Sequence, residues 1–252
     1  MDNQWELTFY QQGYIIIPCE NMSSLAALRQ AVEEATNQST LSLMHEYVTA
    51  AEINDVRLRA FRKINGLDRW DSIYKSIAAT YIKTLLGPDL AIQSKLNLSI
   101  QMPYDATSLL QLHTDALSGQ SPFEIVLWVP LTKCHDTNSM YIFSKKCSSE
   151  MLQRLQNHEN TGMLALFDEY RSEAKYIDIN YGECLIFSPT LFHGNTLNET
   201  SFTRVSINCR FKNIFSPEAD SGERRLGSFY RILELSPVAR LGLDYKDEDI
   251  RF

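Results

Sequence analysis

Residues 113–130, which read HTDALSGQSPFEIVLWVP, indicate how the rest of the chain is organised. They place His113 and Asp115 two positions apart, shortly before an apolar run that is typical of a β-strand. From the end of a strand, a histidine and an aspartate at this spacing can direct an imidazole nitrogen and a carboxylate oxygen at one ion. A second histidine from a distant strand would complete the two-histidine, one-carboxylate set that binds non-haem Fe(II) and leaves coordination positions open.

A candidate for the second histidine follows a turn–strand–turn unit further along the chain. Residues 182–189, GECLIFSP, have the glycine, the apolar run and the proline of such a unit, and His193 comes shortly after them. The other histidines, His45, His135 and His158, lie in polar stretches without a ligand-spaced partner, so we expect them at the surface. The His-x-Asp pair alone is weak evidence, and the position of His193 strengthens it.

A strand with an unusual polar face follows this histidine. Residues 204–211, RVSINCRF, alternate between polar and apolar side chains. In a strand this alternation places Arg204, Ser206, Asn208 and Arg210 on one face. A face with two arginines is not typical of a core, but it suits a carboxylate, which a guanidinium binds through two parallel charge-assisted hydrogen bonds. The hydroxyl of Ser206 can reach the same anion.

Together these residues resemble the Fe(II)- and 2-oxoglutarate-dependent oxygenases, in particular the phytanoyl-CoA dioxygenase-like branch. The resemblance implies that His113, Asp115 and His193 are the catalytic residues that hold the iron. It also implies that Arg204 binds the distal carboxylate of 2-oxoglutarate, with Ser206 beside it. In this family, 2-oxoglutarate and O2 are co-substrates in the oxidation of a substrate carbon, and the protein supplies the open metal face and orients the reactants.

The resemblance extends to other segments. Trp128 matches a tryptophan that lines the co-substrate pocket in this branch, and Asn97 matches a strand asparagine that some members use for 2-oxoglutarate. Residues 139–146, SMYIFSKK, are similar to a family strand that usually ends in Pro-Gly-Ser-His-Lys, but the proline, glycine and histidine are missing. This departure indicates a divergent subfamily. The amino-acid sequence of residues 121–131 and 139–141 is similar to that of oxygenases encoded among bacterial carbohydrate-biosynthesis genes.

The fold that the resemblance implies is mainly β with flanking helices, around a double-stranded β-helix (jelly roll, cupin-like) core of about eight strands in two sheets. We expect residues 1–252 to form a single oxygenase domain. Residues 1–90 supply an N-terminal strand and helices, and residues 91–214 supply the core, with a helical insertion at about 150–175. Residues 215–252 form a C-terminal extension.

Hydrophobic periodicity predicts helices before the core. Residues 23–38 carry apolar side chains at helical spacing, with Asn21 or Ser23 as the cap. Residues 67–86 carry a second apolar stripe and form one predicted helix that ends at Gly87-Pro88. Residues 46–63 are mixed and charged, and we interpret them as loop and short helix.

Composition narrows the classes of partner. A net charge of −7 and a pI near 5.3 argue against a nucleic-acid partner, which would require clustered Lys and Arg. The start of the chain lacks the pattern of a signal peptide, and no apolar run approaches the length of a membrane span, so we expect a cytoplasmic protein without a membrane partner. The five cysteines show no Cys-x-x-Cys spacing, and we expect reduced, mostly buried thiols.

The substrate prediction rests on the polar residues that strand alternation and the adjoining turns place towards the pocket. These residues are Gln101, Tyr104, Gln111, Asn208 and Arg210. They favour a polar small molecule that is carbohydrate-derived, with Arg210 at an anionic group and Tyr104 packed on a sugar face. The alternative is that Arg210 pairs with an acidic neighbour and Tyr104 belongs to the core.

The sequence therefore predicts an Fe(II)- and 2-oxoglutarate-dependent dioxygenase that hydroxylates a polar small molecule. Two alternatives remain at this point. A cupin-like metal-dependent isomerase or hydrolase could use the same three ligands, for example with zinc. A non-catalytic sugar-binding barrel could share the fold. Arg204 with Ser206 favours the oxygenase, because a hydrolase does not need a buried carboxylate clamp.

Overall fold

Antiparallel strands form two sheets in the computed structural model, which describes residues 4–157, 162–218 and 222–245. The larger sheet has the order β1 (Tyr14–Pro18), β7 (Glu183–Phe187), β4 (Glu124–Pro130), β9 (Arg204–Asn213), β2 (Leu90–Gln93) and β10 (Tyr230–Glu234), and β3 (Asn97–Gln101) also pairs with β9. The smaller sheet has the order β6 (Lys175–Tyr176), β5 (Met140–Ile142) and β8 (His193–Asn195). Every residue of β4 is buried, because this central strand is covered on both faces.

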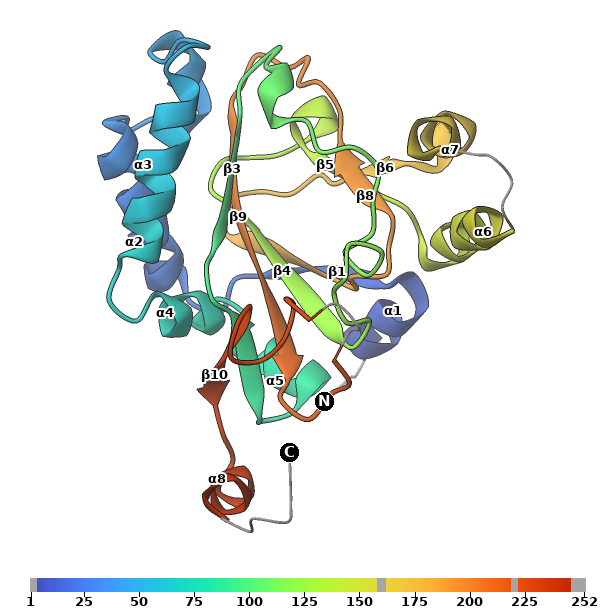
Figure 1. Cartoon of the computed structure of the whole chain (residues 1–252). Helices are drawn as coiled ribbons and strands as arrows, with labels where there is room; N and C mark the ends of the chain where they lie inside the picture. Colours follow the sequence, from blue (N-terminus) through green and yellow to red (C-terminus); the bar gives the residue numbers. More distant parts are fainter. Residues whose placement is uncertain (1–3, 158–161, 219–221, 246–252) are drawn as a thin grey trace.

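Helices cover the outer face of the larger sheet (Figure 1). They are α2 (Met22–Thr36), α3 (Ile53–Asn65), α4 (Trp70–Ser76) and α5 (Ala79–Leu86). The other helical elements are α1 (Gln4–Gln12), η1 (Leu41–Glu46), η2 (Ala106–Ser108), η3 (Asp136–Asn138), α6 (Lys145–Gln156), α7 (Met163–Tyr170), η4 (Arg171–Glu173) and α8 (Pro237–Asp244). More of the described residues lie in helices than in strands, so the fold is a mixture of helices and antiparallel sheet rather than mainly β.

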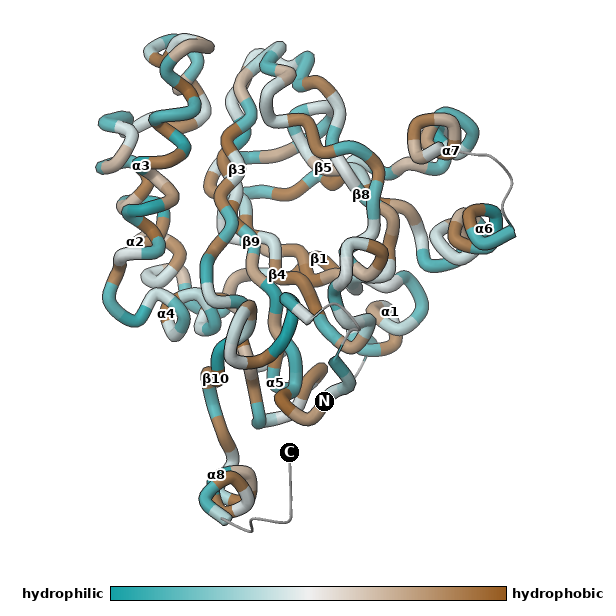
Figure 2. Tube along the Cα trace, viewed as in Figure 1, coloured by the Kyte–Doolittle hydropathy of each residue, from teal (hydrophilic) through white to brown (hydrophobic). Residues whose placement is uncertain are grey.

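The helix predicted over residues 23–38 is confirmed as α2. The side chain of Asn21 accepts a hydrogen bond from the backbone N–H of Ser24 and caps the helix. Leu25 and Leu28 of its apolar stripe are fully buried, in one cluster with side chains of the larger sheet. Figure 2 shows hydrophobic residues interspersed with hydrophilic ones along α2 and α3, as expected for helices with one face on a sheet.

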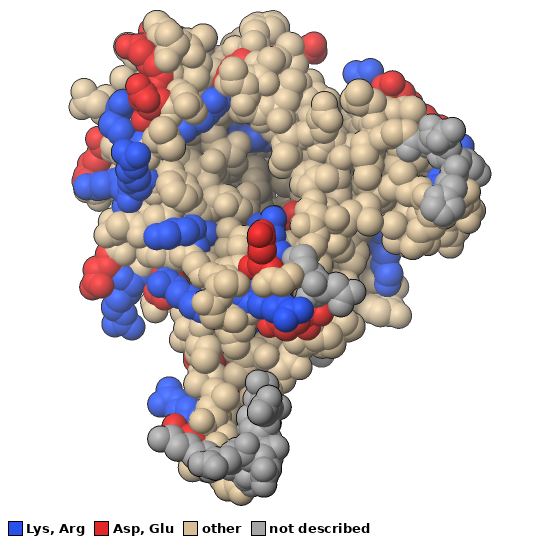
Figure 3. All heavy atoms as spheres, in the orientation of Figure 1, with Lys and Arg blue, Asp and Glu red and all other residues tan. Residues whose placement is uncertain are grey.

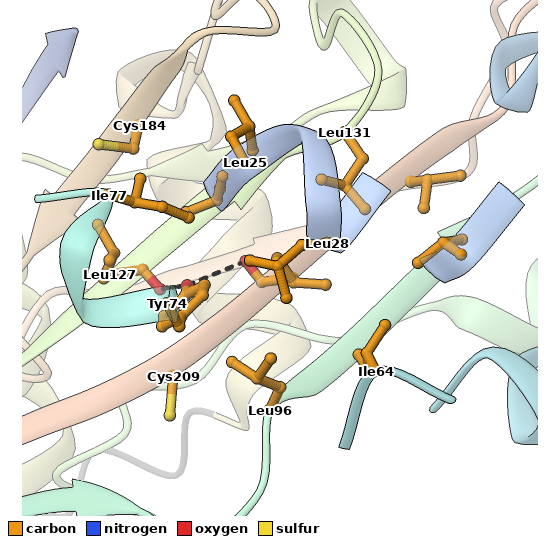
Figure 4. Close-up of a cluster of buried hydrophobic side chains, with 14 of the residues drawn as sticks. Leu25, Leu28, Ile64, Tyr74, Ile77, Leu96, Leu127, Leu131, Cys184 and Cys209 are labelled. Atoms are coloured by element: carbon orange, nitrogen blue, oxygen red, sulfur yellow. Dashed lines mark hydrogen bonds between the residues drawn. The ribbon is translucent and has the colours of Figure 1, made fainter. Parts of the chain in front are cut away.

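A buried tyrosine fastens the helical layer to the sheet. Tyr74 of α4 donates a hydrogen bond of 2.7 Å from its hydroxyl to the backbone carbonyl of Leu127 in β4 (Figure 4). Its ring stacks on Phe211 of β9. The outer face of β9 packs into the same cluster through its apolar side chains, Val205, Ile207, Cys209 and Phe211. The opposite face of β9 therefore points towards the smaller sheet.

Two predictions about helices are wrong in part. Residues 46–63 contain a full helix, α3, whose buried side chains Ile53, Val56, Ala60 and Ile64 recur at helical spacing. Residues 67–86 form two helices, α4 and α5, rather than one. The backbone leaves the helical conformation between them at Ala78, and the carbonyl of the preceding Ile77 accepts a hydrogen bond from the backbone N–H of Glu20.

The segment after the core adds a strand to the larger sheet. β10 pairs antiparallel with β2, and Glu234 at its end forms ion pairs with Lys75 and Lys83. α8 follows and lies beyond the edge of the sheet (Figure 1). α6 and α7 occur between β5 and β6, where a helical insertion was predicted. Among the described residues, none of the helices has the length and apolar character that a membrane span requires.

Candidate metal centre

Three side chains that are distant in the sequence meet between the two sheets. His113, Asp115 and His193 each offer one ligand atom, and these atoms all lie within 4.8 Å of one another. The Nε2 atom of His113 is 3.9 Å from Oδ1 of Asp115. Asp115 and His193 are buried and His113 is partly exposed, so one side of the group faces the cavity. Two imidazoles and one carboxylate form a donor set that fits a divalent transition metal.

Backbone pairing places the two histidines side by side. The N–H of His113 donates to the carbonyl of His193, and the N–H of His193 donates back to His113, at 3.0 and 2.9 Å. His193 belongs to β8, whereas His113 lies in an irregular segment with only this one bridge. The prediction that His113 lies on a strand is therefore wrong, although its position relative to His193 is fixed equally well.

Each histidine is oriented by a carbonyl oxygen two residues earlier in the chain. The Nδ1 atoms of His113 and His193 lie 2.8 and 2.9 Å from the carbonyls of Gln111 and Leu191. A carbonyl only accepts hydrogen bonds, so Nδ1 carries the proton and Nε2 keeps its lone pair for a metal. Burial, opposed by Asp115, lowers the pKa of His193 to about 4. The ring is therefore neutral at neutral pH.

Arg210 grips the carboxylate of Asp115. Its Nη2 and Nε atoms donate to Oδ1 and Oδ2 of Asp115, at 2.5 and 3.2 Å. Burial alone would raise the pKa of Asp115, but the charge of Arg210, assisted by His193, outweighs burial and lowers it. The carboxylate is thus held ionised and in one orientation. The alternative considered for Arg210, pairing with an acidic neighbour, is the arrangement observed, and its predicted contact with an anionic substrate group has no support here.

A cavity of about 460 Å³ adjoins the three side chains. Figure 3 shows this face of the molecule hollowed, with atoms of Lys or Arg around the hollow. Its polar lining includes the predicted residues Asn97 and Arg204, and Trp128 lies among its apolar ones. The ring of Phe187, also in the lining, packs edge-on against His193 with centroids 4.9 Å apart.

Arg204 is the least satisfied charge in this cavity. It is only 3% exposed, and its one hydrogen bond runs from Nη2 to the hydroxyl of Ser99 at 2.9 Å. Its Nε atom and the hydroxyl of Ser206 are buried without a partner. No acidic side chain of the described residues forms an ion pair with it. An unpaired buried guanidinium is costly, so this pair of residues fits an anionic ligand such as a carboxylate.

Three of the residues expected on the pocket face do not line the cavity. Tyr104 lies in the predicted turn with a φ of 57°, but it is 69% exposed and does not line the cavity, so its contact with a sugar stays a prediction. Gln101 is buried and donates to the carbonyl of Thr196. Gln111 contributes only its backbone carbonyl to His113.

Arg57 and Asn54 of α3 also line the cavity, and sequence reasoning missed them. Arg57 donates to the carbonyl of Ile100 and forms an ion pair of 2.5 Å with Asp105. They were missed because residues 46–63 were interpreted as loop and short helix. Helical spacing of the apolar side chains in α3 is the pattern that would have placed both on one helix.

The remaining histidines and the cysteines take no part in the site. Among the described residues, His45 contacts Thr203 and His135 contacts its neighbour Asp136. His158 lies outside the described residues. The five cysteines are free thiols, of which four are buried, as predicted.

Comparison with protein-family models gives no match. Among curated proteins, the chain is 23% identical over 192 residues to the streptomycin biosynthesis protein StrG of Streptomyces griseus, covering 76% of this chain and 72% of StrG.

Solved structures share the fold over nearly the whole chain. The non-haem, α-ketoglutarate-dependent carbocyclase SnoK from nogalamycin biosynthesis superposes with a TM-score of 0.59 at 14% identity, covering 92% of this chain and 96% of SnoK. HygX from Streptomyces hygroscopicus, solved with nickel and 2-oxoglutarate bound, superposes with a TM-score of 0.55 at 13% identity, covering 92% and 98%. The predicted resemblance is confirmed at the level of the fold.

Proposed function

We propose that this chain is an Fe(II)- and 2-oxoglutarate-dependent dioxygenase that hydroxylates a polar small molecule. The observation that carries the proposal is the pairing, in one cavity, of a His–Asp–His group with an unpartnered buried arginine. The two-histidine, one-carboxylate set is the donor set of non-haem Fe(II) oxygenases, and Arg204 supplies the site for a second, anionic reactant. The shared fold with SnoK and HygX supports the same reaction class.

The residues of this chain have separate tasks in the reaction. When bound, iron with 2-oxoglutarate and O2 supplies the oxidising chemistry, in which 2-oxoglutarate becomes succinate and CO2. His113, neutral His193 and ionised Asp115 would hold the metal, and Arg210 keeps the carboxylate of Asp115 oriented. Arg204 would bind and orient the distal carboxylate of 2-oxoglutarate.

Other residues in and beside the cavity would assist. Ser206 lies outside the cavity lining, but its buried hydroxyl has no partner among the described residues, so it would be a further donor for the carboxylate at Arg204. Trp128 and Asn97, which the resemblance assigns to the co-substrate pocket, line the same cavity as Arg204. The apolar side chains of Val126, Met140 and Phe187 line the cavity and would limit the access of water to a bound metal.

The cavity wall also supports the proposed substrate class. Its lining includes the neutral polar side chains of Asn54, Thr107, Ser108 and Asn195. These groups suit the hydroxyl groups of a carbohydrate-derived molecule better than a fatty acyl chain. The streptomycin biosynthesis protein among the relatives supports a biosynthetic role. A small-molecule substrate, a cytoplasmic location and the absence of nucleic-acid and membrane partners belong to this proposal, as do a double-stranded β-helix core and a single domain over residues 1–252.

Anaerobic titration tests the proposal. Adding Fe(II) and then 2-oxoglutarate should produce a visible metal-to-ligand charge-transfer band, and His193→Ala should abolish it, because two ligands hold iron weakly. His135→Ala is the matched control and should leave the band unchanged, since the His135 ring pairs with its neighbour Asp136 and does not line the cavity. A band that survives in His193→Ala would remove His193 from the site.

A substrate screen tests the proposed class of substrate. Nucleotide sugars, glycans, polyols and fatty acyl-CoA esters should be offered to the iron-loaded enzyme, with O2-dependent succinate release as the readout. We expect stimulation by at least one carbohydrate-derived compound. Stimulation by fatty acyl-CoA alone would contradict the proposed substrate class.

A further inference from the structure

A chain of hydrogen bonds leads from the candidate metal ligand Asp115 through the sheet and back to the cavity. Arg210, which holds Asp115, also donates from Nη1 to Oε1 of Gln93 at 3.0 Å. Gln93 donates from Nε2 to Oδ1 of Asn97 at 3.2 Å. Asn97 donates from Nδ2 to Oδ1 of Asn208 at 2.9 Å.

The direction of this chain is fixed by its first member. A guanidinium has five N–H donors and no acceptor, so Gln93 must turn its carbonyl oxygen towards Arg210. Its NH2 group then faces Asn97, which must accept with its oxygen and donate with its nitrogen. By the same rule Asn208 accepts from Asn97. The NH2 group of Asn208 is left over, without a partner among the described residues.

The register of the sheet directs this free donor into the cavity. Asn208 lies opposite Asn97 on one side and Trp128 on the other, and all three residues line the cavity. It shares the inner face of β9 with Arg204 and Arg210, between the unpartnered guanidinium and the one that holds Asp115. A donor at this place faces a ligand that extends from Arg204 to the metal group.

We propose that Asn208 donates a hydrogen bond from its amide nitrogen to an oxygen of the bound keto acid, and that Gln93 is the positioning residue that fixes this direction. The inference rests on the proposed function, because it takes 2-oxoglutarate as the ligand. Gln93 is buried and lies outside the cavity lining, so it would reach the keto acid through the two asparagines, and its contact with Arg210 is the reason for measuring iron affinity in parallel. The same arginine thus orients a metal ligand and a ligand-binding amide.

The sharpest test is to reverse the direction of the hydrogen bonds that run from Gln93 to Asn208. In Gln93→Glu both side-chain oxygens accept, so Asn97 must turn its NH2 group towards Glu and its oxygen towards Asn208. Asn208 must then present its oxygen, instead of its NH2 group, to the cavity. Calorimetric titration of 2-oxoglutarate into the Fe(II)-loaded protein without O2 should show affinity roughly 10- to 100-fold weaker, as expected when a charge-assisted hydrogen bond is lost. Iron affinity, measured in parallel, should change less than the 2-oxoglutarate affinity.

Matched variants separate the effect of hydrogen-bond direction from the effect of the charge that Gln93→Glu adds. Gln93→Met breaks the chain without reversing it and should weaken binding much less than Gln93→Glu. Asn208→Ala and the isosteric Asn208→Asp should each weaken binding by themselves. In the Asn208→Ala background, Gln93→Glu should have little further effect, because the amide that it reverses is absent. Circular dichroism and thermal unfolding identify any variant that fails to fold, and Asn208→Asp then replaces Asn208→Ala in the cycle.

Several outcomes would overturn the inference. The first is an unchanged 2-oxoglutarate affinity in Gln93→Glu, and the second is an equal loss of affinity in Gln93→Met. The third is a full loss of affinity on Gln93→Glu substitution in a protein without the Asn208 amide, which would mean that the new charge acts directly. A wild-type protein that binds iron but no 2-oxoglutarate would overturn the proposed function as well. Wild-type binding with no loss in the variants would overturn only the inference.

Discussion

Arg204 shows how one buried residue can indicate a missing reactant. Its guanidinium is removed from water, it has one hydrogen bond, and burial lowers its pKa. Folding a chain around such a group costs free energy unless an anion completes the site. Arg210, six residues further along the same face of β9, is different because Asp115 satisfies it within the protein. The two arginines therefore have distinct roles, although they share one face of β9.

Arg204→Lys should weaken 2-oxoglutarate binding by about 2–4 kcal/mol while iron affinity changes little, because an ammonium cannot reproduce the bidentate contact with a carboxylate. Calorimetric titration of each ligand measures the two affinities separately. Arg57→Lys is the matched control, since Arg57 also lines the cavity but already pairs with Asp105. An equal loss of 2-oxoglutarate affinity in both variants would contradict the role given to Arg204.

The residues that could be predicted from sequence are those whose chemistry is specific. His113, Asp115 and His193 were identified because their types and order match a metal donor set, and the structure brings them together. Tyr104 lies outside the cavity lining because the predicted turn has a positive φ there, and the sequence does not give the direction of a side chain in such a turn. The partner of Arg210 could not be predicted, because alternation gives the face of a side chain but not what approaches it from another loop.

At the scale of elements, hydrophobic periodicity predicted which residues lie on one apolar face of a helix. It did not predict where tertiary contacts interrupt the helix. The apolar stripe of α2 is long and capped, so its position followed from sequence. The stripe of residues 67–86 is continuous, yet the helix divides at Ala78, next to Ile77, whose carbonyl accepts a hydrogen bond from Glu20. The single bridge at His113 is equally invisible in sequence, since it depends on β8 lying alongside.

The attachment of the helical layer leads to a stability prediction. Tyr74→Phe removes the hydroxyl that donates to Leu127, and burial raises the pKa of Tyr74, so this hydroxyl remains a donor at any ordinary pH. We expect the free energy of unfolding to fall by about 1–2 kcal/mol, measured by urea denaturation. Binding of 2-oxoglutarate should not change, because Tyr74 packs on the outer face of the sheet. Tyr47→Phe is the control, since Tyr47 is exposed, and an equal loss there would refute the explanation.

At the scale of the whole molecule, the candidate metal centre joins the two sheets. His193 belongs to the smaller sheet through β8, and Asp115 is held to the larger sheet through Arg210 of β9. Between them, side chains from β4 and β5, including Val126 and Met140, pack in one apolar cluster. A metal bound by all three residues would therefore cross-link layers that otherwise meet through apolar packing and the bridge at His113.

Metal binding should consequently raise the free energy of unfolding and also slow hydrogen exchange locally, and removal of the metal should reverse both effects. Saturating Fe(II) without O2 should stabilise the protein by about 2.7 kcal/mol at a hundredfold excess over the dissociation constant. Hydrogen exchange should slow most at the N–H groups of His113 and His193, which pair across the site, and least in α2 and α3 on the outer face. His193→Ala should lose both effects, because the cross-link requires a ligand from each sheet. Slower exchange confined to α2 and α3 would mean that the metal binds elsewhere.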